Sequence, residues 1–115
     1  MSHDALLPAQ QRTLLDQLRH TRGSPIPIER LTFALYGHRY DGGPDAANAL
    51  TRRVLLELRR TLGNQGIIIL TIGFGRATQG YMLDPAHLDR VEALLNRQTE
   101  VAIEVARARR AVGSR

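Results

Sequence analysis

The sequence PDAANALTRRVLLELRRTL, residues 44–62, decides the fold that we predict for this chain. Pro44 suits the first position of a helix, Asp45 suits its positive first turn, and Gly63 suits its end. Apolar residues recur at helical spacing along one side of the segment, namely Ala47, Leu50, Val54, Leu55, Leu58 and Leu62. The pattern predicts an amphipathic helix whose apolar stripe faces the core.

The opposite side of this helix is polar, and most of its residues are arginine: Asn48, Arg52, Arg53, Arg59 and Arg60. Arginine and asparagine side chains recognise base edges in the major groove of DNA, and arginine also binds phosphate. An ordinary amphipathic helix whose arginines only keep it hydrated would show the same pattern. The segments around the helix are needed to choose between these interpretations.

Two shorter helices are expected before residue 44. Residues 8–20 are predicted to form the first and residues 28–36 the second. Their inner faces consist of Leu14, Leu15, Leu18, Leu31, Ala34 and Leu35. Residues 24–28, SPIPI, cannot be helical throughout, because the residue before each proline is pushed toward extended geometry, and they are consistent with a short edge strand. Residues 38–45 are rich in turn formers and lead into the arginine-rich helix.

A β-hairpin is expected after the arginine-rich helix. Residues 67–72 form an apolar, mostly β-branched run that predicts a strand, residues 73–80 form a glycine-bounded loop, and residues 81–83 form the returning strand. Asp84 followed by Pro85 signals a further helix, which we expect to extend to about residue 112. The predicted fold class is therefore α+β and mostly α, with three helices, a hairpin and a long C-terminal helix.

This order is that of a winged helix-turn-helix, in which the third helix enters the major groove and the hairpin forms the wing. Three segments resemble the OmpR-type winged-helix effector domain of transcriptional regulators: LTFALYG (31–37), LELRRTLG (56–63) and IIILTIGFGRATQGYML (67–83). In that family a Leu-Arg pair closes the recognition helix, and a hydrophobic strand, a glycine-containing wing and a Gly-Tyr-x-Leu ending follow. Here the pair is Leu58-Arg59 and the ending is Gly80 to Leu83. The resemblance covers roughly residues 8–83.

The chain departs from the family pattern at both ends. The residues before Pro8 are too few for the family's N-terminal sheet, no receiver domain is expected, and the C-terminal helix is additional. We therefore expect a stand-alone relative with a winged-helix DNA-binding domain in residues 1–84 and a C-terminal helix in residues 85–115.

The resemblance also implies which residues contact DNA. The groove-facing positions of the third helix would be Asn48, Ala49, Arg52, Arg53 and Leu56, and the helical wheel leaves the same set off the apolar stripe. Arg59 and Arg60 are expected to contact phosphate or to be surface charges. Arg76 in the wing and Arg39 in the loop before the helix are further candidates, each with a solvated surface residue as the alternative.

Composition points to the same class of partner. The formal net charge is +5 and all 16 basic residues are arginine, which favours an acidic partner, nucleic acid first. The chain has no cysteine, and its four histidines are scattered without ligand spacing, so we expect neither a metal site nor a cofactor. No catalytic constellation stands out, and we expect no enzymatic activity. No apolar run approaches the roughly 20 residues that span a bilayer, which favours a cytoplasmic, nucleoid-associated protein.

These observations lead to two functional hypotheses. The first is a sequence-specific regulator of transcription that binds double-stranded DNA. The second is a protein–protein interaction module on the same scaffold, since fold does not settle function. The third helix discriminates between them: a protein-binding version should expose apolar residues there, whereas this helix is expected to expose arginines with only Leu56 apolar.

The C-terminal helix is predicted to form a homodimer. A helix over residues 85–112 would be about 40 Å long, which is more than this small domain can cover. Its apolar positions near three-four spacing are Leu88, Val91, Leu95, Ala102 and Val105, and Gln98 interrupts the series. The alternative is that the first half packs on its own domain and the remainder frays.

Overall fold

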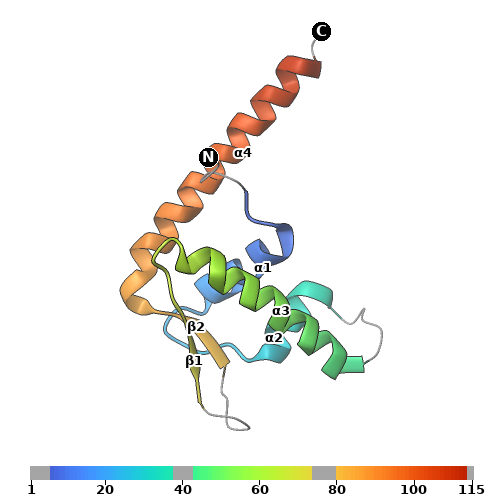
Figure 1. The fold of residues 1–115 in the computed structure, drawn as a ribbon, viewed down its shortest axis with the longest axis vertical. Helices are drawn as coiled ribbons and strands as arrows, with labels where there is room; N and C mark the ends of the chain where they lie inside the picture. The colour runs from blue at the N-terminus through green and yellow to red at the C-terminus, as the bar shows by residue number, and fades with distance from the viewer. Residues whose placement is uncertain (1–5, 38–42, 74–79, 114–115) are drawn as a thin grey trace.

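The computed structural model describes residues 6–37, 43–73 and 80–113 (Figure 1). Three helices come first, α1 (Ala9–His20), α2 (Ile28–Tyr36) and α3 (Gly43–Gly63). An antiparallel hairpin of β1 (Ile69–Ile72) and β2 (Gly80–Leu83) follows, and then the 3₁₀ turn η2 (Pro85–His87) and the long helix α4 (Leu88–Gly113). The predicted α+β, mostly helical fold class is confirmed, and the order of the elements is compatible with a winged helix.

The first strand is shorter than the apolar run that predicted it. The backbone N–H of Ile67 donates to the carbonyl of Leu62 at 2.9 Å, so this residue closes the C-terminal end of α3. Strand pairing then begins at Ile69, which lies opposite Leu83. The apolar run at residues 67–72 therefore contains both the residue that ends α3 and the first strand. Apolar patterning alone does not show where one element stops and the next begins.

The segment SPIPI contributes one residue to the sheet. The N–H of Ile26 donates to the carbonyl of Tyr81 at 2.8 Å, and the N–H of Tyr81 donates back to Ile26 at 2.9 Å. Gly80 lies beside this pairing, and a Cβ added there would be 2.4 Å from the carbonyl oxygen of Ile26. The hairpin is thus fixed to the linker between α1 and α2 by backbone contacts that need glycine.

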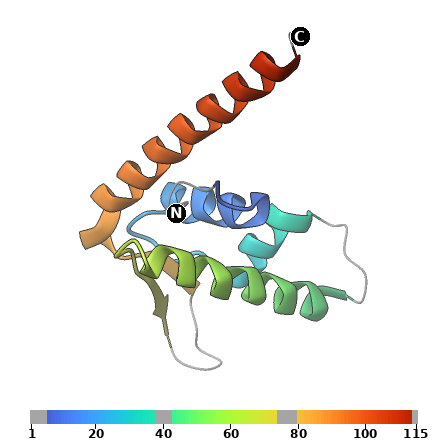
Figure 2. The same ribbon diagram turned by 45° about the horizontal axis from the view of Figure 1, so that its top comes forward.

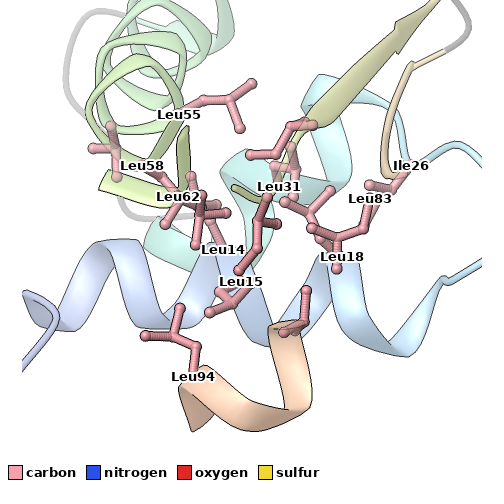
Figure 3. Close-up of a cluster of buried hydrophobic side chains, with 14 of the residues drawn as sticks. Leu14, Leu15, Leu18, Ile26, Leu31, Leu55, Leu58, Leu62, Leu83 and Leu94 are labelled. Atoms are coloured by element: carbon pink, nitrogen blue, oxygen red, sulfur yellow. The ribbon is translucent and has the colours of Figure 1, made fainter. Parts of the chain in front are cut away.

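The hydrophobic core is centred on α1, which lies between α3 and α4 in Figure 2. Its leucines belong to one buried cluster with side chains of α2, α3, α4 and both strands, and Figure 3 shows Leu94 of α4 pointing toward α1 from the side opposite α3. The buried set includes Leu14, Leu15, Leu18, Ile26, Leu31, Leu55, Leu58, Leu62, Leu83, Val91, Leu94 and Leu95. One core therefore extends across the predicted domain boundary after residue 84.

Polar contacts also fix the first half of α4. Arg19 of α1 donates from Nε and Nη2 to the carboxylate of Glu92 at 2.6 and 2.8 Å, and this hydrogen bonding lowers the pKa of Glu92. The pair stabilises the docked helix at neutral pH, and its contribution is lost as the pH falls through that lowered pKa. The side-chain oxygen of the buried residue Gln98 accepts from the N–H of Leu7 at 2.7 Å.

The predicted dimerisation residues divide into two groups. Val91 and Leu95 are buried in the chain's own core, and Leu88 packs against it, so we correct their assignment to a contact between chains. The stripe at these positions faces α1 rather than a partner. Ala102 and Val105 lie beyond the docked part, where α4 continues as a helix to Gly113 and projects from the body (Figure 1).

Candidate nucleic-acid interface

The outer side of α3 is the candidate interface. Ala49, Arg52, Arg53, Leu56 and Arg60 are all exposed on it, whereas Val54, Leu55, Leu58 and Leu62 are buried on the opposite side. Arg52 and Arg60 are eight residues apart, about 12 Å along the helix axis. Figure 2 shows α3 on the side of the body away from α4, so the projecting tail does not cover this face.

The arginines of this face are available to a partner. The guanidinium groups of Arg52, Arg53 and Arg60 form no hydrogen bond or ion pair with any other described residue. They therefore give α3 an outer surface of uncompensated positive charge, next to which Glu57 is also exposed. Anionic groups such as phosphate match this surface in charge, and the planar guanidinium suits bidentate recognition.

Asn48 has a role inside the protein that its sequence position did not reveal. It is half-buried, and its Oδ1 accepts from the hydroxyl of Thr32 in α2 at 2.6 Å. Thr32 Oγ1 also lies 2.8 Å from Thr51 Oγ1 on α3. Part of the hydrogen-bonding capacity of Asn48 is therefore used to fix α3 against α2, which corrects its description as a side chain that is free to read bases.

Arg59 is also placed differently from expectation. Its guanidinium is turned toward the hairpin, where Nη2 donates to the carbonyl of Ile69 at 3.2 Å and to the hydroxyl of Thr71 at 2.5 Å. Its Cζ lies 5.5 Å from the centre of the Tyr81 ring. The prediction grouped Arg59 with Arg60 as a phosphate contact or surface charge, but only Arg60 is exposed.

Leu50 was assigned to the apolar stripe, and the structure corrects this. Its exposed fraction is 48%, close to the 50% of Leu56. The two leucines are six residues apart and so lie about 120° apart around the helix axis, with Arg53 between them. The outer side of α3 thus has two separate half-exposed leucines rather than the single one predicted, but they do not form one continuous apolar patch.

Two predicted contacts cannot be placed. Arg39 and Arg76 lie outside the described residues, in the segments between Gly37 and Gly43 and between Gly73 and Gly80. Their assignment as DNA contacts stays a prediction. The described part of the site therefore consists of α3 and the two strands that precede and follow residue 76.

The sequence pattern did not reveal the buried polar residues between α2 and α3. Thr32 is 4% exposed and Thr51 is fully buried, and the hydroxyl of Thr51 also donates to the carbonyl of Ala47 at 3.0 Å. The available signal was the position of Thr51, which lies on the apolar side of α3 between Ala47 and Leu55. A polar residue inside an apolar stripe indicates a partner on the facing helix.

The described residues form neither a metal-binding cluster nor a membrane-spanning helix. Within the described residues, no group of three or more histidine, cysteine or carboxylate side chains is arranged to hold a metal ion. In residues 6–37, 43–73 and 80–113, every helix is too short or too polar to span a lipid bilayer. No protein-family model, no curated protein and no solved structure matches the chain.

Proposed function

We propose that this protein is a sequence-specific, double-stranded-DNA-binding regulator of transcription that inserts α3 into the major groove. The observation that supports the proposal most directly is the set of exposed arginines on the outer side of α3, which form no ion pair with any other described residue. The helix is held by its other side in a body of three helices and a hairpin. The resemblance of residues 31–37, 56–63 and 67–83 to OmpR-type effector domains supports the same assignment.

In this proposal, the residues of α3 have separate roles. Arg52 and Arg53 lie near the middle of the helix, where a side chain reaches base edges, and arginine pairs with guanine through two hydrogen bonds. Arg60, nearer the C-terminal end, contacts phosphate and so contributes affinity without sequence preference. Ala49 and Leu56 offer apolar contacts to thymine methyl groups. The hairpin contacts the flanking backbone, and the binding needs neither a cofactor nor a catalytic group.

Binding to duplex DNA is expected to depend strongly on salt. If each chain of a dimer neutralises about three to five phosphates, the slope of log affinity against log salt is on the order of −5 to −9. A fluorescently labelled duplex, enriched from random DNA by repeated binding, would be titrated by anisotropy between low and physiological salt. Affinity that stays constant over this range, or no binding at low salt, would contradict the proposal.

A protein–protein interaction module is the second candidate, and the exposure of Leu50 and Leu56 is the observation that favours it. Interface cores are usually apolar and depleted of charge, whereas Arg53 separates these two leucines. The substitution Leu50→Ser distinguishes the two candidates, because it should weaken binding to a protein partner that covers Leu50. A DNA-binding α3 should tolerate this change, because Leu50 lies about 120° around the helix axis from Leu56 and so at the edge of the groove-facing side.

We also propose that the protein is a homodimer formed by the projecting part of α4. The stripe that docks α4 on α1 continues beyond the body as Val101, Val105, Ala108 and Val112, and these valines remain partly or fully exposed. Because α1 already covers the stripe at Val91 and Leu95, a partner helix cannot follow it along its whole length. Two projecting segments can pair antiparallel, with Val101 opposite Val112 and Val105 opposite Ala108, as an isologous two-fold contact requires.

The dimer is tested best by point substitution, since deleting α4 would remove Val91, Leu94 and Leu95 from the core. We expect the full chain to be a dimer by light scattering at about 100 μM and Val105→Glu to be a monomer, because a charge would be buried in the contact. Ile103→Glu adds the same charge about 160° away on the same helix, where Ile103 is 46% exposed, and should stay dimeric. An unsubstituted chain that is monomeric at this concentration would rule the dimer out.

A further inference from the structure

Arg59 connects the candidate recognition helix to both strands of the hairpin. Thr71 of β1 and Tyr81 of β2 are paired across the sheet, and both side chains contact the guanidinium group. The carbonyl of Ile69, two residues before Thr71 in β1, accepts from the same Nη2. A single side chain of α3 thus bonds to one strand and lies over an aromatic ring of the other.

These contacts compete with a role for Arg59 in binding phosphate. Each terminal nitrogen of a guanidinium carries two protons, and Nη2 has two acceptors within the protein. The cation also lies over the face of the Tyr81 ring, where the ring quadrupole attracts it. A phosphate would have to replace several favourable contacts that already exist, whereas the neighbouring Arg60 is exposed and has no such partners among the described residues.

We infer that Arg59 is a positioning residue, which fixes the hairpin against α3 so that both elements meet one DNA duplex in the correct relative orientation. Ile69 and Leu83 of the hairpin pack in the core. Other hydrogen bonds fix the hairpin at sites outside α3, at Ile26 on the linker before α2 and at His87, whose Nδ1 accepts from the N–H of Ile68 at 3.2 Å. Arg59 is the described side chain of α3 that hydrogen-bonds to the strands. This inference depends on the proposed DNA binding and assigns a specific role within it.

The test is a double-mutant cycle of Arg59→Ala and Thr71→Ala, read as DNA affinity and as salt slope in the full chain. Arg59→Ala removes the hydrogen bonds to Ile69 and Thr71 and the contact with the Tyr81 ring, and it should weaken binding roughly three- to tenfold. Thr71→Ala removes only one of these contacts and should weaken binding by a smaller factor, about two- to threefold. The double variant should bind about as weakly as Arg59→Ala alone, because the contact that Thr71→Ala removes is already absent when Arg59 is replaced. Thr71→Ala removes no charge from the protein. A smaller salt slope in this variant would therefore show that the hairpin has lost contacts with DNA phosphates.

Arg60→Ala is the matched control, since it removes the same charge from the adjacent position. It should lower the salt slope by about one and combine additively with Thr71→Ala, as expected for a direct phosphate contact. If Arg59→Ala behaves in this way and Thr71→Ala has no effect, Arg59 is a phosphate contact and the inference is wrong. If the unsubstituted chain does not bind duplex DNA at all, the proposed function itself fails, which is a distinguishable result.

Discussion

Gly80→Ala is expected to destabilise the folded chain by roughly 2–4 kcal/mol. The new Cβ would lie 2.4 Å from the carbonyl oxygen of Ile26 and 2.9 Å from the nitrogen of Pro27, and both are backbone atoms that cannot rotate away. The φ angle of Gly80 is also +152°, a conformation that residues with a side chain rarely adopt. Relief of the clash requires the chain at Ile26 to move away from Tyr81, which breaks their paired hydrogen bonds.

Chemical denaturation followed by circular dichroism measures this effect. Gly63→Ala is the matched control, because a Cβ there would meet no described atom within 4 Å beyond its chain neighbours and the adjacent backbone of α3. We expect a change within about 0.5 kcal/mol for this control, as for most exposed substitutions. Equal stability of the two variants would show that the linker before α2 does not contact the hairpin closely.

Arg52→Ala and Arg53→Ala are each expected to reduce binding to the preferred DNA site by roughly 1–3 kcal/mol and to relax the base preference at the position that each contacts. Both side chains are exposed on the outer side of α3 without a partner among the described residues, so the substitutions should leave the fold unchanged. The substitutions should therefore change the affinity for DNA and leave the free energy of unfolding unchanged.

The experiment compares affinities for the preferred site and for random duplex DNA at one salt concentration. Arg107→Ala is the control for charge, because Arg107 is exposed on the projecting part of α4, away from α3. It should affect both DNAs little. If Arg52→Ala and Arg53→Ala lower the affinities for specific and random DNA equally, these arginines bind only phosphate, and the base-reading side chains lie elsewhere.

The existence and order of the elements could be predicted from local patterns. The stripe of α3 from Ala47 to Leu62, the β-branched run before Gly73 and the Asp84-Pro85 start signal each need only neighbouring residues to be interpreted. The exposed arginines Arg52, Arg53 and Arg60 follow from the same helical periodicity. For these features, the arrangement of side chains along one element carries the necessary information.

The partners of each face could not be predicted in this way. The stripe of α4 has the same spacing at Val91 and at Val105, but only Val91 is part of the core, because α4 projects from the body beyond its docked first half (Figure 2). A periodic pattern predicts which residues lie on one side of a helix. It does not predict whether that side packs against the chain's own core or against another molecule.

The fold class, the amphipathic character of α3 and the positive charge of its outer side therefore follow from the sequence, because they depend on periodicity and charge along the chain. The tertiary structure alone decided that Arg59 faces the hairpin, that Asn48 bonds to Thr32, and that Val91 and Leu95 belong to the core. The physical reason is that each of these contacts joins residues from different elements. Their separation in space depends on how the helices and the hairpin pack, which local spacing does not encode.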